Sequence, residues 1–149
     1  GSLLKDPKAF KSVIQIFASR YKEAQIDAVV ALESRGFIFG SALAYELEVP
    51  LVLIRKKGKL PREVYSVSYG LHYGKDVFEL EKSSLNPGQK VLIIDDVLAT
   101  GGTSRAAAAL VNQAGAEVYE AAFLIEIVNL KGREISPFPV FSQLELEGN

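Results

Sequence analysis

Hydrophobic residues alternate along the chain between helical spacing and short continuous runs. Asp6 and Pro7 suit the N-cap and first residue of a helix, and the apolar residues that follow predict an amphipathic helix to about residue 23. Residues 26–32 form a near-continuous apolar run, as a strand buried in a parallel sheet requires. The later predicted elements are a helix over 37–47, strands over 50–54, 77–80, 91–94 and 118–127, and a helix over 103–113 ended by Gly115.

Residues 58–76 interrupt this pattern. They contain four Gly or Pro residues among several Ser and Tyr, which predicts a long loop or a mobile hairpin. Strands that alternate with helices elsewhere indicate an α/β fold with a mostly parallel sheet. In such a fold the ligand-binding loops gather at the carboxyl ends of the strands. Nothing in the pattern marks a domain boundary, so we expect a single domain over residues 1–149.

The composition narrows the possible functions. The 149 residues are 48% hydrophobic and 23% charged, as is ordinary for a folded domain. A net charge of −1 gives no reason to expect a nucleic-acid or anionic membrane partner. The lack of Cys excludes disulfides, thiolate metal sites and cysteine nucleophiles, and a single His argues against multi-histidine metal sites. With no apolar run of transmembrane length, we expect a cytoplasmic protein.

The strongest candidate site follows the predicted strand over 91–94. Two carboxylates, Asp95 and Asp96, come first, and a loop of small residues then leads into a helix. This loop consists of Ala99, Thr100, Gly101, Gly102 and Thr103. Its glycines let backbone N–H groups converge, and the helix adds its unpaired N–H groups and positive dipole end, so the loop suits a phosphate monoester. The alternative is a tight strand–helix turn in which Thr103 or Ser104 merely caps the helix.

A second candidate anion site is Ser34-Arg35-Gly36. It lies after the predicted strand over 26–32 and before the helix over 37–47. The guanidinium of Arg35 can bind two phosphate oxygens at once, which a Lys cannot do. Taken alone, the same three residues would be an ordinary turn.

Residues 91–103 resemble the phosphoribosyl pyrophosphate (PRPP) motif of the type I phosphoribosyltransferases, and are most similar to the members that use adenine. Three further segments match that family, at 33–37, 55–61 and 131–134. The resemblance extends over nearly the whole chain from Leu3. It implies the type I phosphoribosyltransferase fold and the Mg²⁺-dependent transfer of a phosphoribosyl group from PRPP to adenine. The products would be AMP and pyrophosphate, and the enzyme would be a homodimer.

The resemblance also implies a role for each candidate residue. Asp95 and Asp96 would hold the ribose hydroxyls and favour the positive charge that develops on the ring. Mg²⁺ is expected on substrate oxygens rather than in a protein cage. The loop over 99–103 would bind the 5′-phosphate, and Val97 and Ala99 would lie under the base. Pyrophosphate would be bound by Ser34, Arg35, Arg55, Lys56 and Lys59, with a cis peptide bond before Ser34.

Two features depart from the family pattern. The segment over 58–76 resembles the family's flexible lid, but His72-Tyr73 stands where the family commonly has Glu-Tyr. His72 is therefore either the group that accepts a proton from adenine or a bystander. The family also has a segment before the residue that matches Leu3, part of which forms a hood over adenine. This sequence therefore leaves recognition of the base open.

Three alternatives remain at this point. The chain could use PRPP with another base, such as hypoxanthine or orotate, although the usual hypoxanthine loop begins Glu-Asp rather than Asp-Asp. It could be a regulator that binds PRPP or AMP without catalysis. It could also be a catalytically impaired fragment of the same fold.

Overall fold

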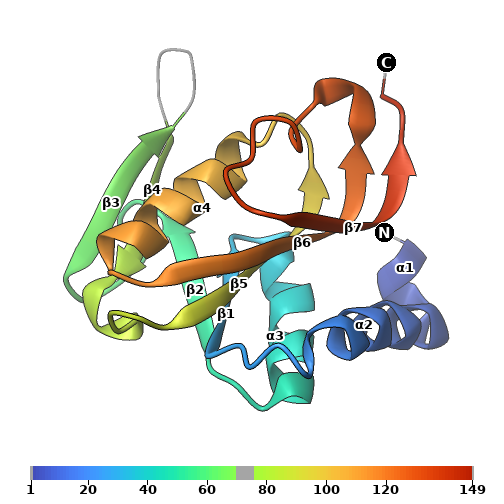
Figure 1. Ribbon diagram of the computed structural model, residues 1–149, viewed down its shortest axis with the longest axis horizontal. Helices are drawn as coiled ribbons and strands as arrows, with labels where there is room; N and C mark the ends of the chain where they lie inside the picture. Colours follow the sequence, from blue (N-terminus) through green and yellow to red (C-terminus); the bar gives the residue numbers. More distant parts are fainter. Residues whose placement is uncertain (1, 70–75, 149) are drawn as a thin grey trace.

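The computed structural model describes residues 2–69 and 76–148, which form one seven-stranded sheet with helices on both faces (Figure 1). The strand order is β3-β4-β2-β1-β5-β6-β7. The strands are β1 (Ala28–Leu32), β2 (Leu51–Lys56), β3 (Val64–Tyr69), β4 (Asp76–Glu81), β5 (Lys90–Leu98), β6 (Glu117–Ile127) and β7 (Val140–Leu146). The helices are α1 (Ser2–Lys5), α2 (Pro7–Tyr21), α3 (Arg35–Leu47) and α4 (Gly102–Gln113), with 3₁₀ turns η1 (Lys82–Ser84) and η2 (Val128–Leu130).

The sheet is mostly parallel, as the sequence predicts. Strands β2, β1, β5, β6 and β7 run parallel, and only β4 and β3 join antiparallel at one edge of the described sheet. Helix α4 covers one face, while α2 and α3 cover the other (Figure 1). Every residue of β1 is buried because the strand has helices on both sides, which explains its continuous apolar run. No helix in the described part of the chain is both long and apolar enough to span a membrane.

Local sequence signals account for how α2 and α3 are placed. Asp6 caps α2 as predicted, accepting hydrogen bonds from the N–H groups of Lys8 at 3.1 Å and Ala9 at 3.2 Å. Helix α3 packs close to the sheet at Gly40, where a Cβ would lie only 2.7 Å from the Cβ of Ala31. A larger residue at this position would push the helix off the strands that carry the site.

The structure corrects several boundaries. β3 pairs antiparallel with β4, which agrees with the hairpin, one of the two forms predicted for 58–76, although both strands begin and end at residues that the sequence did not mark. β7 was not predicted at all. Helix α4 is capped by Ala114, and Gly115 follows it in the left-handed conformation with φ of +78°.

The most consequential difference concerns β5, which continues four residues beyond the predicted strand. Its ladder with β1 stops at Ile94, but its ladder with β6 continues to Leu98. Asp95 and Asp96 therefore lie within an extended strand, not after it as predicted. Successive residues of a strand point to opposite faces of the sheet, so the strand conformation sets the directions of the two carboxylates. At Asp95 and Asp96 this conformation is held by pairing with β6 alone.

Candidate active site

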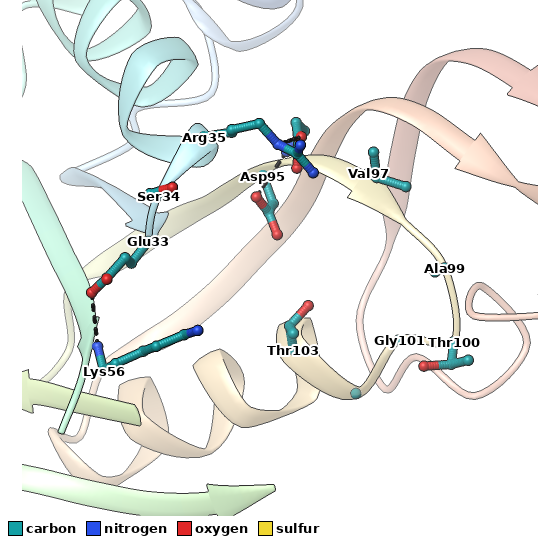
Figure 2. Close-up of a pocket in the computed structure, with 12 residues that line it drawn as sticks. Glu33, Ser34, Arg35, Lys56, Asp95, Val97, Ala99, Thr100, Gly101 and Thr103 are labelled. Atoms are coloured by element: carbon teal, nitrogen blue, oxygen red, sulfur yellow. Dashed lines mark hydrogen bonds and ion pairs between the residues drawn. The ribbon is translucent and has the colours of Figure 1, made fainter. Parts of the chain in front are cut away.

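The candidate site is a cavity of about 500 Å³ at the carboxyl ends of β1 and β5. It joins three segments that are distant in the sequence: the start of α3, the carboxylates of β5 and the loop before α4 (Figure 2). The lining residues are Glu33, Ser34, Arg35, Lys56, Asp95, Asp96, Val97, Ala99, Thr100, Gly101, Gly102 and Thr103. The two predicted anion sites thus face one shared space.

The two carboxylates of β5 both line this cavity. The N–H of Asp96 donates to Oδ1 of Asp95 at 2.8 Å, and Nε of Arg35 lies 2.5 Å from Oδ2 of Asp96. Burial raises the pKa of Asp95 to about 7. The N–H of Asp96 opposes this rise, the negative charge of Asp96 adds to it, and Arg35 opposes it more weakly. Asp95 therefore titrates near neutral pH in the free protein.

The start of α3 is in direct contact with this pair. The peptide bond between Glu33 and Ser34 is cis, as the resemblance implies. Gly36 lies so close to β5 that a Cβ there would be 3.1 Å from both Oδ1 of Asp95 and the carbonyl oxygen of Ile94. A Cβ at this position would force the Asp95 carboxylate or the backbone at Ile94 to move by a few tenths of an ångström.

Glu33 organises the basic residues at the end of β2 and just after it, and the sequence analysis missed it. Its half-buried carboxylate accepts hydrogen bonds from the N–H of Lys56 at 2.9 Å, from Arg55 and from Nζ of Lys59. Burial alone would raise the pKa of Glu33, but the hydrogen bonds of Lys59 and Lys56 outweigh it and hold that pKa below its usual value. Two features of the sequence could have indicated this role. Glu33 is an acidic residue within the matched segment 33–37, and the basic residues near the end of the next strand could pair with it.

Glu33 also distinguishes the basic residues of this region that are predicted to bind pyrophosphate, Arg55, Lys56 and Lys59, because it pairs with the side chains of only two of them. Arg55 and Lys59 are paired with Glu33 and do not line the cavity. The side chain of Lys56, in contrast, extends into the cavity towards the start of α4 (Figure 2). In this arrangement Lys56 and Arg35 are the cations that face the shared space.

The loop before α4 has the geometry of an anion cradle. Gly101 is the N-cap of α4, with φ of +90°, and it has no side chain that could accept from the helix N–H groups. Ser104 donates back to the carbonyl of Gly101 at 3.2 Å instead of capping those groups. A Cβ at Gly102 would meet nothing nearer than Oγ1 of Thr100 at 3.9 Å. Packing therefore does not require a glycine at 102, whereas close approach by a ligand would.

Two of the predicted site residues, His72 and Tyr73, lie outside the described residues. Val97 and Ala99, predicted to lie under the base, both line the cavity. Within the described chain there is no group of three or more His, Cys, Asp or Glu side chains that could hold a metal ion.

Comparison with known proteins defines the class first. Residues 1–138 match the phosphoribosyl transferase domain family. The chain therefore belongs to the phosphoribosyltransferase family, and its fold is that of this class. Within the family it belongs with the adenine phosphoribosyltransferases. The adenine phosphoribosyltransferase of Stochomys longicaudatus is 52% identical over 149 residues, which cover 97% of this chain and 83% of the relative.

Solved structures agree with this placement. Adenine phosphoribosyltransferase from Saccharomyces cerevisiae, complexed with an imino-altritol bisphosphate and adenine, matches with a TM-score of 0.91 and 42% identity, over 95% of this chain and 83% of that one. The enzyme from Trypanosoma brucei, in complex with AMP, pyrophosphate and ribose-5-phosphate, matches with a TM-score of 0.89 and 30% identity, over 96% and 67%.

Proposed function

We propose that this chain transfers the phosphoribosyl group of PRPP to adenine, forming AMP and releasing pyrophosphate, as in purine salvage. The observation that carries the proposal is the single cavity that joins two anion cradles across a pair of carboxylates. PRPP carries a phosphate at one end of its ribose and a pyrophosphate at the other. Its two anionic groups therefore match the two anion cradles, with the ribose hydroxyls beside the carboxylates. The AMP, pyrophosphate and ribose-5-phosphate bound to the Trypanosoma brucei enzyme support the same substrate class.

Each group has a defined task in this reaction. The loop over 99–103, called the phosphate loop below, binds the 5′-phosphate through backbone N–H groups. Ser34, Arg35 and Lys56 bind pyrophosphate, and Glu33 holds Arg55 and Lys59 beside them. As the bond from the anomeric carbon to pyrophosphate breaks, N9 of adenine bonds to that carbon and loses its proton.

The carboxylates act at the point where charge develops. Positive charge grows on the ribose ring as pyrophosphate leaves, and ionised Asp95 and Asp96 stabilise it while accepting hydrogen bonds from the ribose hydroxyls. Their benefit is greater in the transition state than in the ground state, so they raise turnover more than affinity.

Magnesium fits the site as a partner of the substrate. Mg²⁺ prefers oxygen ligands, keeps several waters and usually binds through substrate phosphates rather than in an all-protein cage. In this cavity it would be held by PRPP oxygens, and Asp95 and Asp96 would balance its charge. When bound, the ion neutralises charge on the departing pyrophosphate.

The resemblance to the family also supports a homodimer. Helices α2 and α3 enclose a largely apolar groove that includes Ile38 and Tyr45, and 82% of Tyr45 is exposed. Sedimentation of the chain at micromolar concentration tests this part of the proposal. A single species of monomer mass would refute it.

Product formation tests the activity itself. The chain is mixed with PRPP, Mg²⁺ and each purine base in turn, and nucleotide is followed by chromatography, with Gly102→Val as the matched control for the phosphate loop. We expect AMP with adenine, and no product with the variant. Formation of another nucleotide in place of AMP would favour a transferase for a different base. Binding of PRPP without any product would favour a regulator or an impaired fragment.

A further inference from the structure

The segment after η2 packs directly against the back of the phosphate loop. A Cβ at Gly132 would overlap the carbonyl oxygen of Ala99 and lie 3.1 Å from the backbone nitrogen of Gly101. A Cβ at Gly101 would in turn lie 3.1 Å from the carbonyl oxygen of Gly132. The two backbones therefore touch without any intervening side chain, and a shift in one must be transmitted to the other.

Arg133 fixes this segment to the ends of β6 and β7. Its Nε donates to both carboxylate oxygens of Glu126 at 3.2 Å, its Nη2 donates to Oε1 at 2.7 Å, and its Nη1 donates to the carbonyl of Val140 at 2.6 Å. The Glu126 side chain is only 5% exposed, and it also accepts from Ser142 at 2.9 Å. A forked guanidinium held at several points by such partners has little freedom to move.

The phosphate loop needs external support of this kind. It contains two adjacent glycines, which permit many backbone conformations, and Gly101 offers no side chain that could hold the loop. Donors that bind a phosphate must already point at it, because ordering them on binding costs affinity. Glu126 also lies opposite Leu98 in the β5–β6 ladder, next to the residue where the loop begins.

We infer that Arg133 is a positioning residue for the phosphate loop, acting through the backbone contact of Gly132 with Ala99 and Gly101. Arg133 is not among the residues that line the cavity. It fixes the backbone of Gly132, which the loop contacts, so that the N–H groups of the loop already point towards the 5′-phosphate before it binds. This inference rests on the proposed function, since it assumes that the loop over 99–103 receives that phosphate.

A second ion pair on the same strand provides a matched control. Arg20 of α2 donates to Glu120 of β6 at 2.7 and 3.2 Å, near the opposite end of β6 from Glu126. The exposure of the two pairs is similar, with 43% for Arg20 and 10% for Glu120 against 44% for Arg133 and 5% for Glu126. Arg20→Met and Arg133→Met therefore remove comparable interactions, but only the second lies behind the loop.

The experiment compares the Kd of AMP, measured by calorimetry, among four proteins: the parent, Arg133→Met, Arg20→Met and Gly102→Val. The KM of PRPP is compared among the first three, which turn over. We expect Arg133→Met to raise both constants about tenfold or more, as happens in metal sites when a group that orients a metal ligand is removed. Arg20→Met should leave both constants at the parent value, although both arginine variants melt at lower temperature. Should Arg133→Met fail to fold, Arg133→Lys serves in its place, because it keeps the charge but loses the fork.

The outcomes separate the two proposals. If Gly102→Val keeps the parent affinity for AMP, the loop does not bind the 5′-phosphate and the proposed function fails at that point. If Gly102→Val loses AMP while Arg133→Met and Arg133→Lys bind it as the parent does, the positioning role is refuted. Equal weakening by Arg20→Met would also refute it, since the effect would then be one of general stability.

Discussion

Replacing Asp95 with Asn should stabilise the free protein, by an amount that depends on pH. Burial raises the pKa of Asp95 from its ordinary 3.8 to about 7. Each pKa unit corresponds to about 1.4 kcal/mol, so the ionised carboxylate lowers the free energy of unfolding by about 4 kcal/mol at most. Because Asp95 borders an open cavity, we expect about 2–4 kcal/mol at pH 8. Asn keeps the shape and the acceptor for the N–H of Asp96 without the charge.

The sign of the pH dependence follows from proton uptake. Between about pH 4 and pH 7 the folded protein binds a proton at Asp95 that the unfolded chain has released, so this group makes stability fall as pH rises. The advantage of Asp95→Asn should therefore be largest at pH 8, be smaller at pH 5 and vanish only below the unfolded pKa of 3.8, towards pH 3.

Urea unfolding of the metal-free, ligand-free protein at pH 5 and pH 8 measures this difference. Glu117→Gln, which removes an exposed carboxylate at the start of β6, should change stability by less than about 0.5 kcal/mol at both values. An Asp95→Asn variant that is no more stable than the parent at pH 8, or equally stabilised at both pH values, would refute the reasoning. The same variant should lose activity, because the charge that destabilises the free fold is the one proposed to stabilise the transition state.

Three further results are expected. Gly40→Ala should lower the free energy of unfolding by about 1–3 kcal/mol, because its Cβ would crowd Ala31. Ser41→Ala, on the exposed side of the same helix, should not lower it. Equal urea midpoints for the two variants would contradict this. Asp96→Asn should slow turnover about 10²-fold with little change in the Kd of AMP, and turnover at the parent rate would rule out its ribose role. If His72 accepts the adenine proton, the rate at saturating substrates should rise with pH through the imidazole range, and His72→Gln should flatten that limb; an unchanged profile would make it a bystander.

Local chemistry in the sequence was enough to predict much of the fold. Asp6 caps α2 because its carboxylate reaches the first N–H groups of the helix wherever that helix packs. The apolar runs of β1 and β5 predicted buried parallel strands, because only a strand covered on both faces is apolar at every position. The glycines before α4 likewise indicated an anion cradle from backbone properties alone.

Tertiary contacts decided the rest. The sequence could not show that β5 continues through Asp95 and Asp96, because that extension depends on pairing with β6 after β1 has ended. Nor could it separate Lys56 from Lys59, since their different positions follow from Glu33, which is more than twenty residues away and meets them only when β1 and β2 are paired.

The behaviour of the candidate site depends on the same long-range contacts. The pKa of Asp95 is set by burial beneath the start of α3, with Gly36 against its carboxylate, and the phosphate loop rests on Gly132, about thirty residues further along the chain. Residue types thus determine which chemistry is available, because side-chain and backbone groups carry it with them. The packing of distant segments determines the protonation state and the orientation of those groups. Burial, which shifts a pKa, and contacts between distant residues, which fix an orientation, arise only when the chain folds.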